Sequence, residues 1–486
     1  MVQNIDQDAS QSHRLNPIME DKVSPDWSSK KVCVVGAGMW GLAAARELRR
    51  EGLDVAVLEQ SGGVGGQWLY DAATDGGDPL GLAGVHSSIF ASLRLNSPRE
   101  MMGFSDFPFR PSAAGGDARR YPVHGELLRY VRDFCDVFGL MDAVRLNTRV
   151  VRVAMAPPRR DGSLKWTVTS KRDGEEVETE EVFDAVVVAT GHYSQPRLPS
   201  IEGMDRWRRR QLHSHSYRVS DSFHGEVVVI VGCSLSGMEI ALELLCVAKE
   251  VHLSAKSTEE DMVAATSKML SRHGNLHLRP QVEHLREDGR VVFDDGSCVV
   301  ADTVVYCTGY NYSFPFLETE GKVTVDDNGV GPLYEHVFPP SLAPSLSFVG
   351  IPSKVILPQF AEVQARWVAH VLSGRRTLPS PEEMLRAVEE HAASMEAAGT
   401  PKRRTHDLLL DLEQCDEYGE RTCGFPRMEQ WKKEILRSSF SGLLDDIETY
   451  RDGYRDSDLV RHGLRHDGWT NEKDVGDDEE HASLPA

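Results

Sequence analysis

The stretch KVCVVGAGMWG at residues 31–41 decides the fold of this chain. It begins with an apolar run that is typical of a buried strand, and its glycines have the spacing G-x-G-x-x-G. In such a turn the first glycine permits a tight bend, the second lets the backbone approach a pyrophosphate, and the third lets helix and strand pack closely. The turn consists of Gly36, Ala37, Gly38, Met39, Trp40 and Gly41. It predicts a strand–turn–helix unit that binds a dinucleotide at the helix N-terminus.

The residues that follow strengthen this prediction. Residues 42–50 have a helix-like pattern, and residues 54–58 form a second apolar run that ends at Glu59. This acid lies about 20 residues after the first glycine, where a carboxylate is expected to accept hydrogen bonds from a ribose. A glycine turn that binds nothing is therefore the less favoured interpretation.

A second turn of this kind follows the predicted strand 226–231 and precedes the predicted helix 238–245. Serine replaces its middle glycine, so the backbone is slightly less free to approach a ligand. The next predicted strand, 251–254, ends without an acid and is followed by Lys256. A cation there attracts a 2′-phosphate and favours NADPH over NADH, although a solvated surface lysine is the alternative. The turn consists of Gly232, Cys233, Ser234, Leu235, Ser236 and Gly237.

Two nucleotide sites in one chain suggest that electrons pass between them. NADPH at the second turn would deliver a hydride, and FAD near Glu59 would accept it. A disulfide reductase is the alternative, but none of the 8 cysteines forms the C-x-x-C pair that such an enzyme uses. No group of His, Cys, Asp or Glu has metal-ligand spacing in the sequence, so the expected cofactors are FAD and NADPH without a metal.

The repeated pattern predicts an α/β fold with two dinucleotide-binding (Rossmann-like) domains, the NADP domain being inserted into the FAD domain. Alternation of apolar and polar residues around Val151 adds a β-meander insertion. Two apolar strands end in Thr190-Gly191 and Thr308-Gly309. The predicted segments are a flexible lead at 1–28, the FAD domain at 29–195 and 326–464, the NADP domain at 196–325, and a disordered acidic tail at 465–486.

Composition narrows the range of partners. The 486 residues carry a net charge of −21, and so acidic a surface repels nucleic acid and anionic lipid. No apolar run approaches the ~20 residues that a transmembrane segment needs, and the polar N-terminus does not have the pattern of a signal peptide. We therefore expect a cytoplasmic protein, with peripheral membrane association left open. The oligomeric state is also open, a dimer being one alternative.

Several further segments resemble the flavin-containing monooxygenases, in particular their plant glucosinolate S-oxygenase-like branch. The resemblance covers roughly residues 30 to 440 and rests on GGQW at 65–68, LRLNSPRE at 93–100, ATG at 189–191 and CTGY at 307–310. It implies that Asn96 is an active-site asparagine, whereas a loop asparagine that holds a turn is the alternative. It also implies a set of residues beside the cofactors, to which we add Val151 of the meander: Gly66, Gln67, Trp68, Val151, Thr190, Thr308 and Gly309.

The family signature between the two domains is F-x-G-x-x-x-H-x-x-x-F/Y. Here it reads Trp207, Arg209, His213 and Tyr217, so that an arginine replaces the glycine. If that position needs a positive φ, the arginine is strained by ~1 kcal/mol. The resemblance implies that His213 serves the NADP site, whereas hydrogen bonding within the local loop is the simpler alternative.

The resemblance implies that NADPH reduces FAD, that oxygen adds to the reduced flavin as a C4a-hydroperoxide, and that a thioether or an amine takes one oxygen atom. The substrate pocket is expected where residues 71–90, Asn96 and 355–360 converge. Arg94 and Arg99 are candidates to bind an anionic substrate such as a glucosinolate, and pairing with local acids is the alternative for both. A keto-acid or carbonyl oxygenase and a flavoprotein without enzymatic activity are the alternatives. The expected partners are the small substrate and O2.

Overall fold

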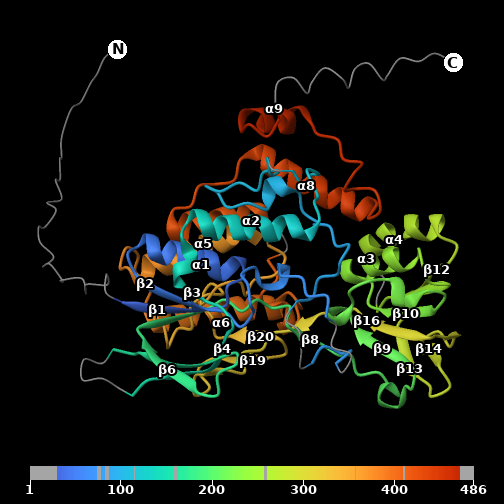
Figure 1. The fold of residues 1–486 in the computed structure, drawn as a ribbon, viewed down its shortest axis with the longest axis horizontal. Helices are drawn as coiled ribbons and strands as arrows, with labels where there is room; N and C mark the ends of the chain where they lie inside the picture. Colours follow the sequence, from blue (N-terminus) through green and yellow to red (C-terminus); the bar gives the residue numbers. More distant parts are fainter. Residues whose placement is uncertain are drawn as a thin grey trace, which may run out of the picture.

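The computed structural model describes residues 30–73, 78–82, 87–113, 115–157, 163–256, 260–355, 357–408 and 411–470. The predicted lead at 1–28 lies outside the described residues, and so does most of the predicted tail at 465–486. The chain forms two units that each contain a parallel sheet (Figure 1).

The first unit is built on a five-stranded sheet of order β21-β7-β1-β2-β3 in which all neighbouring strands are parallel. Apart from the two-residue edge strand β3, which is half-buried to exposed, the strands are short and largely apolar runs buried on both faces, as parallel strands usually are. Their bounds are β1 Lys31–Val35, β2 Asp54–Leu58, β3 Val144–Arg145, β7 Ala185–Val188 and β21 Leu346–Phe348.

Different layers cover the two faces of this sheet. Val32 and Val34 of β1 pack against α1 (Met39–Arg50), α2 (His124–Val137) and α5 (Leu357–Leu372). The alternate residues Cys33 and Val35 pack against an antiparallel meander that contains Trp166 and Phe183. The meander was expected from the alternating pattern, and its strands are β4 Thr148–Met155, β5 Trp166–Arg172 and β6 Glu178–Phe183.

The second unit repeats this plan with the strand order β12-β11-β10-β16-β9, again parallel throughout. Helices α3 (Leu235–Leu244) and α4 (Glu260–Arg272) belong to this unit; α3 packs on one face of the sheet, and a second meander covers the other face. Neither α4 nor this second meander was predicted. The strands are β9 Arg210–His213, β10 Val227–Val231, β11 Glu250–Ser254, β12 Leu276–Arg279, β13 Val282–Leu285, β14 Arg290–Phe293, β15 Cys298–Val300 and β16 Thr303–Tyr306.

The second unit is inserted into the first, because β21 completes the first sheet only after the chain returns. Outgoing strand β8 (Gln195–Pro196) pairs with returning strand β17 (Tyr310–Asn311). The boundaries 29–195, 196–325 and 326–464 remain a prediction. The remaining elements are β18 Leu317–Glu318, β19 Thr324–Asp326, β20 Gly329–Gly331, α6 Pro381–Ala397, α7 Leu412–Cys423, α8 Gln430–Asp445 and α9 Asp458–His466.

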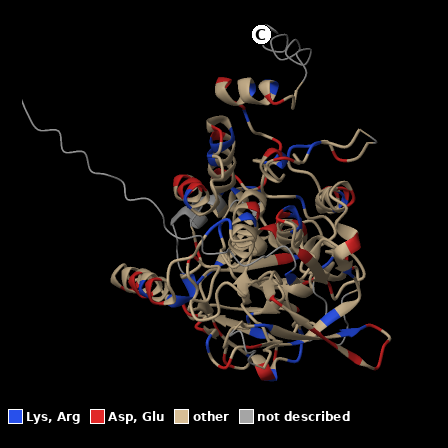
Figure 2. Cartoon of the chain, turned by 90° about the vertical axis from the view of Figure 1, so that its left-hand side faces the viewer, with Lys and Arg blue, Asp and Glu red and all other residues tan. Residues whose placement is uncertain are grey.

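Positions of basic and acidic residues lie close together along the ribbon in Figure 2, and several helices carry both kinds. Many of them form ion pairs, such as Lys31 with Glu181 at 2.9 Å. Among the described helices, none is both long enough and apolar enough to cross a membrane.

The two glycine turns have the close contacts that the sequence predicted. A Cβ on Gly36, which has φ 102°, would lie 2.8 Å from the carbonyl oxygen of Ala189. A Cβ on Gly232, with φ 114°, would lie 2.4 Å from that of Cys307. The third glycine of the first turn, Gly41, approaches Gly36 so closely that its Cβ would be 1.9 Å from that residue's carbonyl oxygen. Only glycine fits these positions without a shift of the backbone.

We expect Gly41→Ala to lower the melting temperature, since overpacking of this kind costs about 1–3 kcal/mol. Gly125→Ala is the matched control, because Gly125 also lies in the first turn of a helix but has no atom within 4 Å of an added Cβ. That control should gain up to about 1 kcal/mol from helix propensity. Thermal unfolding of both variants measures the difference, and equal melting temperatures would contradict the role of Gly41.

Candidate functional site

A cavity of about 250 Å³ lies at the carboxyl ends of β1, β2 and β7, where the first glycine turn begins. Ligands of open parallel sheets bind at this edge. The cavity brings together many of the residues that the sequence singled out: Gly36, Gly38, Met39, Trp40, Glu59, Gly66, Gln67, Trp68 and Thr190.

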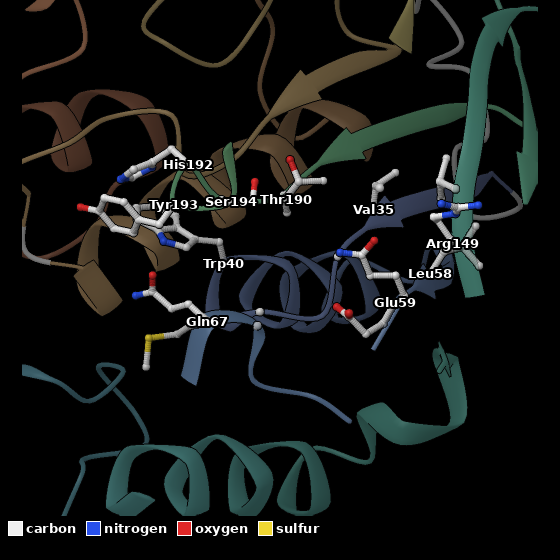
Figure 3. A pocket seen from close by; sticks show the side chains of 18 of the residues that line it. Val35, Trp40, Leu58, Glu59, Gln67, Arg149, Thr190, His192, Tyr193 and Ser194 are labelled. Atoms are coloured by element: carbon white, nitrogen blue, oxygen red, sulfur yellow. The ribbon is translucent and has the colours of Figure 1, made fainter. Parts of the chain in front are cut away.

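Glu59 is held rigidly at one end of the cavity. Its side chain is 4% exposed, and its two carboxylate oxygens accept hydrogen bonds from the backbone N–H groups of Ala37 at 2.7 Å and Ser61 at 2.8 Å. Each oxygen keeps a lone pair for a further donor. Arg149 lies at the same end of the cavity (Figure 3). This end can therefore accept hydrogen bonds from ribose hydroxyls.

The middle of the cavity is lined by backbone rather than by side chains. A Cβ on Gly66, with φ 56°, would lie 2.9 Å from the Cα of Gly38, so the two backbones touch. Helix α1 begins next to this contact, and no side chain caps its N-terminus. Its first N–H groups and partial positive charge are thus available to an anion such as a pyrophosphate.

The opposite end of the cavity contains Trp40, Gln67, His192 and Tyr193 (Figure 3). His192 Nδ1 lies 3.1 Å from the carbonyl oxygen of Gly350, while its Nε2 is buried without a protein partner. The hydroxyl of Thr190 is buried and unpartnered as well. Burial lowers the pKa of His192, which keeps the ring neutral. Two unsatisfied polar atoms in the lining fit a large ligand with polar groups.

The sequence did not single out His192 and Tyr193, although they directly follow the Thr190-Gly191 pair that it did single out. Their position after the last residue of a central strand was the signal that could have found them. Val151 was expected at the site, but the strand presents Thr148, Arg149 and Val150 to the cavity instead.

Asn96 does not line this cavity. Its side chain is exposed, and its Oδ1 lies 3.5 Å from the Ser97 hydroxyl. Ala37 and Gly41 also stay outside the lining, because Ala37 orients Glu59 and Gly41 packs the helix onto the turn.

The second turn lies at the corresponding edge of the second sheet, between β10 and α3, whose N-terminus also has no side-chain cap. Lys256 is exposed and follows β11, and Arg279 ends the neighbouring strand β12. Burial raises the pKa of the Cys233 thiol to about 11, so that it is neutral and unreactive. Leu235, Ser236 and Gly237 form the start of α3 after Ser234, its N-cap.

The two crossing segments meet at the Thr308-Gly309 pair. The Thr308 hydroxyl donates to the carbonyl oxygen of Arg197 at 2.5 Å, and the N–H of Arg197 donates to that of Gly309 at 2.9 Å. These bonds hold the outgoing and returning chains together beside the cavity. The pair therefore serves as a connection between the units.

His213 of the interdomain signature is 0% exposed. Its Nδ1 accepts a hydrogen bond from the N–H of His215 at 3.1 Å, and its ring contacts Tyr310 with centroids 5.3 Å apart. Burial, reinforced by the neighbouring His215, lowers the pKa of His213 to about 4. The side chain is thus a neutral ring that packs between the two units.

The condition for strain at Arg209 is not met, because Arg209 is not among the residues with positive φ. Its guanidinium reaches the carbonyl oxygen of Ala301 at 2.8 Å and lies against Gly289. That glycine provides the space, since a Cβ there would lie 2.3 Å from the Arg209 side chain.

The two arginines that were candidates for binding an anionic substrate form hydrogen bonds with other parts of the chain. Arg94 forms a two-pronged ion pair with Asp452 at 2.7 and 2.8 Å. Arg99 is buried, donates to the carbonyl oxygens of Asp117 and Arg119, and lies over the Phe109 ring. The expectation that they face a substrate is not supported by these contacts, and neither lines the cavity.

The fold brings together one group with metal-ligand spacing among the described residues, Glu250, His252 and His277 on adjacent strands. His252 Nε2 lies 3.3 Å from a Glu250 oxygen, and Arg279 Nε donates to His252 Nδ1 at 3.2 Å. Because Nδ1 accepts this hydrogen bond, the proton of the neutral ring is on Nε2, facing Glu250. That arrangement leaves no lone pair of His252 for a metal.

Two glycine turns at the carboxyl edges of two parallel sheets define a protein with two dinucleotide-binding units. Residues 29–269 and 267–417 match the flavin-binding monooxygenase-like family model. The chain belongs to this family of flavin-binding monooxygenases.

Named relatives extend the comparison. Flavin-containing monooxygenase FMO GS-OX-like 9 of Arabidopsis thaliana is 53% identical over 451 residues, which cover 91% of this chain and 97% of the relative. The GS-OX-like 8 protein of the same plant is 54% identical over 443 residues, 90% of this chain and 95% of the relative. The solved structure of S-allyl-L-cysteine S-oxygenase from Allium sativum is 42% identical, with a TM-score of 0.82 and coverage of 91% of this chain and 99% of that chain.

The neutral state of buried His213 predicts a pH dependence of stability. Its pKa is about 4 in the folded state and 6.5 ordinarily, so the unfolded chain binds more protons between these values. The free energy of unfolding should therefore fall as the pH drops from about 6.5 to about 4. An asparagine at position 213 can still accept the hydrogen bond from the N–H of His215. We therefore expect His213→Asn to lose less stability between pH 6.5 and 4 than the parent protein.

Melting temperatures at several pH values check this prediction. His224→Asn is the control, since His224 is exposed and should leave the pH profile unchanged. If His213→Asn and the parent protein lose the same stability on acidification, His213 does not carry the effect.

Proposed function

We propose that this protein is an NADPH- and oxygen-dependent flavin monooxygenase that adds one oxygen atom to a soft nucleophile, with the sulfur of a thioether as its substrate group. The cavity at the first glycine turn carries the proposal, because it joins a ribose acceptor, an uncapped helix and two unpartnered polar atoms. The similarity to the garlic enzyme, whose name states S-oxygenation, supports sulfur over nitrogen.

The cavity residues fit FAD in one orientation, with its adenosine end at Glu59 and its flavin end at Gln67, Thr190 and His192. Glu59 would accept hydrogen bonds from the adenosine ribose, and the backbone from Gly36 to Gly41 would face the pyrophosphate. Gln67, Thr190 and His192 line the far end, where the flavin ring system would be held. Reduced flavin, when bound, supplies the activation of oxygen.

The second turn fits NADPH, with Lys256 as the cation for the 2′-phosphate. The remaining work of the chain is positioning and exclusion of water. Trp40 and Tyr193 cover the ring end of the cavity, and neutral His213 fills the junction between the units. Asn96 is proposed to present its amide to the reacting oxygen when the cofactors are bound.

The contacts of Arg94 and Arg99 bear on the substrate class. Since both cations are already hydrogen bonded within the fold, recognition of a sulfate or carboxylate by them is disfavoured. We therefore propose a thioether that is recognised through its neutral part. Amines, keto acids and carbonyl compounds are the alternative substrates.

The experiment that tests the function uses the purified protein with bound flavin. NADPH should bleach the flavin absorbance, and oxygen should restore it. Oxygen consumption is then measured with thioethers, amines and keto acids, and the largest increase is expected for thioethers. Absence of bleaching by NADPH would contradict the enzymatic proposal, whereas preference for another class would overturn only the substrate.

Lys256→Glu should raise the KM for NADPH about tenfold, because loss of a charge-assisted contact costs about 1.4 kcal/mol or more. The KM for NADH should change little. Lys249→Glu is the control, since it makes the same charge change just before β11, at the opposite edge of the sheet. Equal changes for both cofactors would remove Lys256 from the phosphate site.

Asn96→Ala should lower the yield of oxygenated product per NADPH consumed and raise the yield of hydrogen peroxide. The reason is that loss of the amide removes a hydrogen bond near the reacting oxygen. Product and peroxide are measured together in the same assay. Unchanged coupling at unchanged turnover would exclude Asn96 from the mechanism.

A further inference from the structure

Arg218 follows the interdomain signature and is 5% exposed. Its guanidinium donates to four backbone carbonyl oxygens. Two of them belong to its own segment, those of His215 at 2.7 Å and Tyr217 at 2.9 Å, and the other two belong to a distant segment. The distant acceptors are Asp71, at 2.7 Å from Nε, and Ser87, also at 2.7 Å. Hydrogen bonds from a charged donor are stronger than those between neutral groups, so the four bonds of Arg218 form a strong connection between the two segments.

Both distant acceptors lie within the stretch between Trp68, which lines the first cavity, and Asn96. From the described residues of this stretch we define 78–82 and 87–93 as the strap. The strap is hydrogen bonded to the interdomain segment at further points: Pro79 accepts from the N–H of His213 at 3.0 Å, and Ala91 donates to the carbonyl oxygen of Arg218 at 2.9 Å.

Apolar side chains of the strap also pack against the second unit. Leu80 lies against the core that contains Trp207, and Phe90 contacts the Tyr217 ring with centroids 5.6 Å apart. Phe90 and Tyr217 share a core with Met238 of α3, the helix that begins at the second glycine turn. The strap is therefore anchored to the second unit, although the chain enters it from Trp68, which lines the first cavity, and leaves it towards Asn96.

We propose that Arg218 is a positioning residue that fixes the strap to the second unit and thereby sets Trp68 and Asn96 relative to the bound nicotinamide. This rests on the proposed function for its catalytic consequence. The planar guanidinium has five donors in a fixed fork, so it serves carbonyls in several directions at once. A lysine ammonium has three donors at one point and cannot reach the carbonyl oxygens of Asp71 and Ser87 together with those of His215 and Tyr217.

The test compares Arg218→Met and Arg218→Lys with the parent flavoprotein. Hydrogen exchange is measured for peptides that cover 87–93, with NADP⁺ bound. We expect exchange at least tenfold faster in Arg218→Met and an intermediate value in Arg218→Lys. The fraction of NADPH that ends as hydrogen peroxide should rise in the same order, while the bound flavin and its spectrum stay unchanged.

Arg110→Met is the matched control. Its guanidinium also donates to two backbone carbonyl oxygens of a distant segment, those of Asp467 and Gly468, away from the strap. It should leave both exchange at 87–93 and the peroxide fraction unchanged. If Arg218→Met does not fold, Arg218→Lys alone carries the comparison.

Unchanged exchange at 87–93 in a folded Arg218 variant would overturn the proposal, and so would faster exchange with an unaltered peroxide fraction. The exchange measurement needs no turnover. A protein that fails to oxygenate any substrate but shows faster exchange would therefore contradict the proposed function and leave the anchoring intact.

Discussion

The close approach of a glycine to the carbonyl group of a neighbouring strand is the constraint on which both units depend. Gly36 lies over Ala189, and Gly232 lies over Cys307, at distances that no side chain would tolerate. In each unit the central strand also bonds the strand that ends in Thr-Gly: the N–H of Ala189 donates to Val35 at 3.0 Å, and that of Cys307 donates to Val231 at 2.8 Å. The turn, the helix N-terminus and the Thr-Gly pair are therefore positioned together.

The insertion of one unit into the other explains where the site residues come from. The outgoing and returning chains pair through β8 and β17, so the Thr-Gly pairs of both units lie near one junction. Aromatic rings and histidines fill that junction, and burial keeps His192 and His213 neutral. A site of this kind offers fixed polar atoms and little acid–base chemistry, which agrees with a reaction carried by the cofactors.

Much of the first site could be predicted because its chemistry is local. The turn at Gly36, the acid at Glu59 and the residues from Gly66 to Trp68 follow one another in the chain, and their roles depend on the backbone of one βαβ unit. Val151 lies one residue beyond the three consecutive residues of β4 that line the cavity, where a bulge shifts the β4–β5 register between Val150 and Arg152. The side chain of Asn96, although part of a recognisable segment, does not face the cavity lining.

The sequence by itself determined the fold class, the two glycine turns, the first meander and the acid Glu59 after the second strand, because each follows from short-range spacing and periodicity. Only the tertiary structure decided the partners of charged and polar side chains. It paired Arg94 with Asp452, accommodated Arg209 beside Gly289, and placed Arg218 on carbonyls of a segment more than a hundred residues away. Such pairings depend on which segments, far apart in the sequence, come into contact in the fold, and no local sequence pattern predicts them.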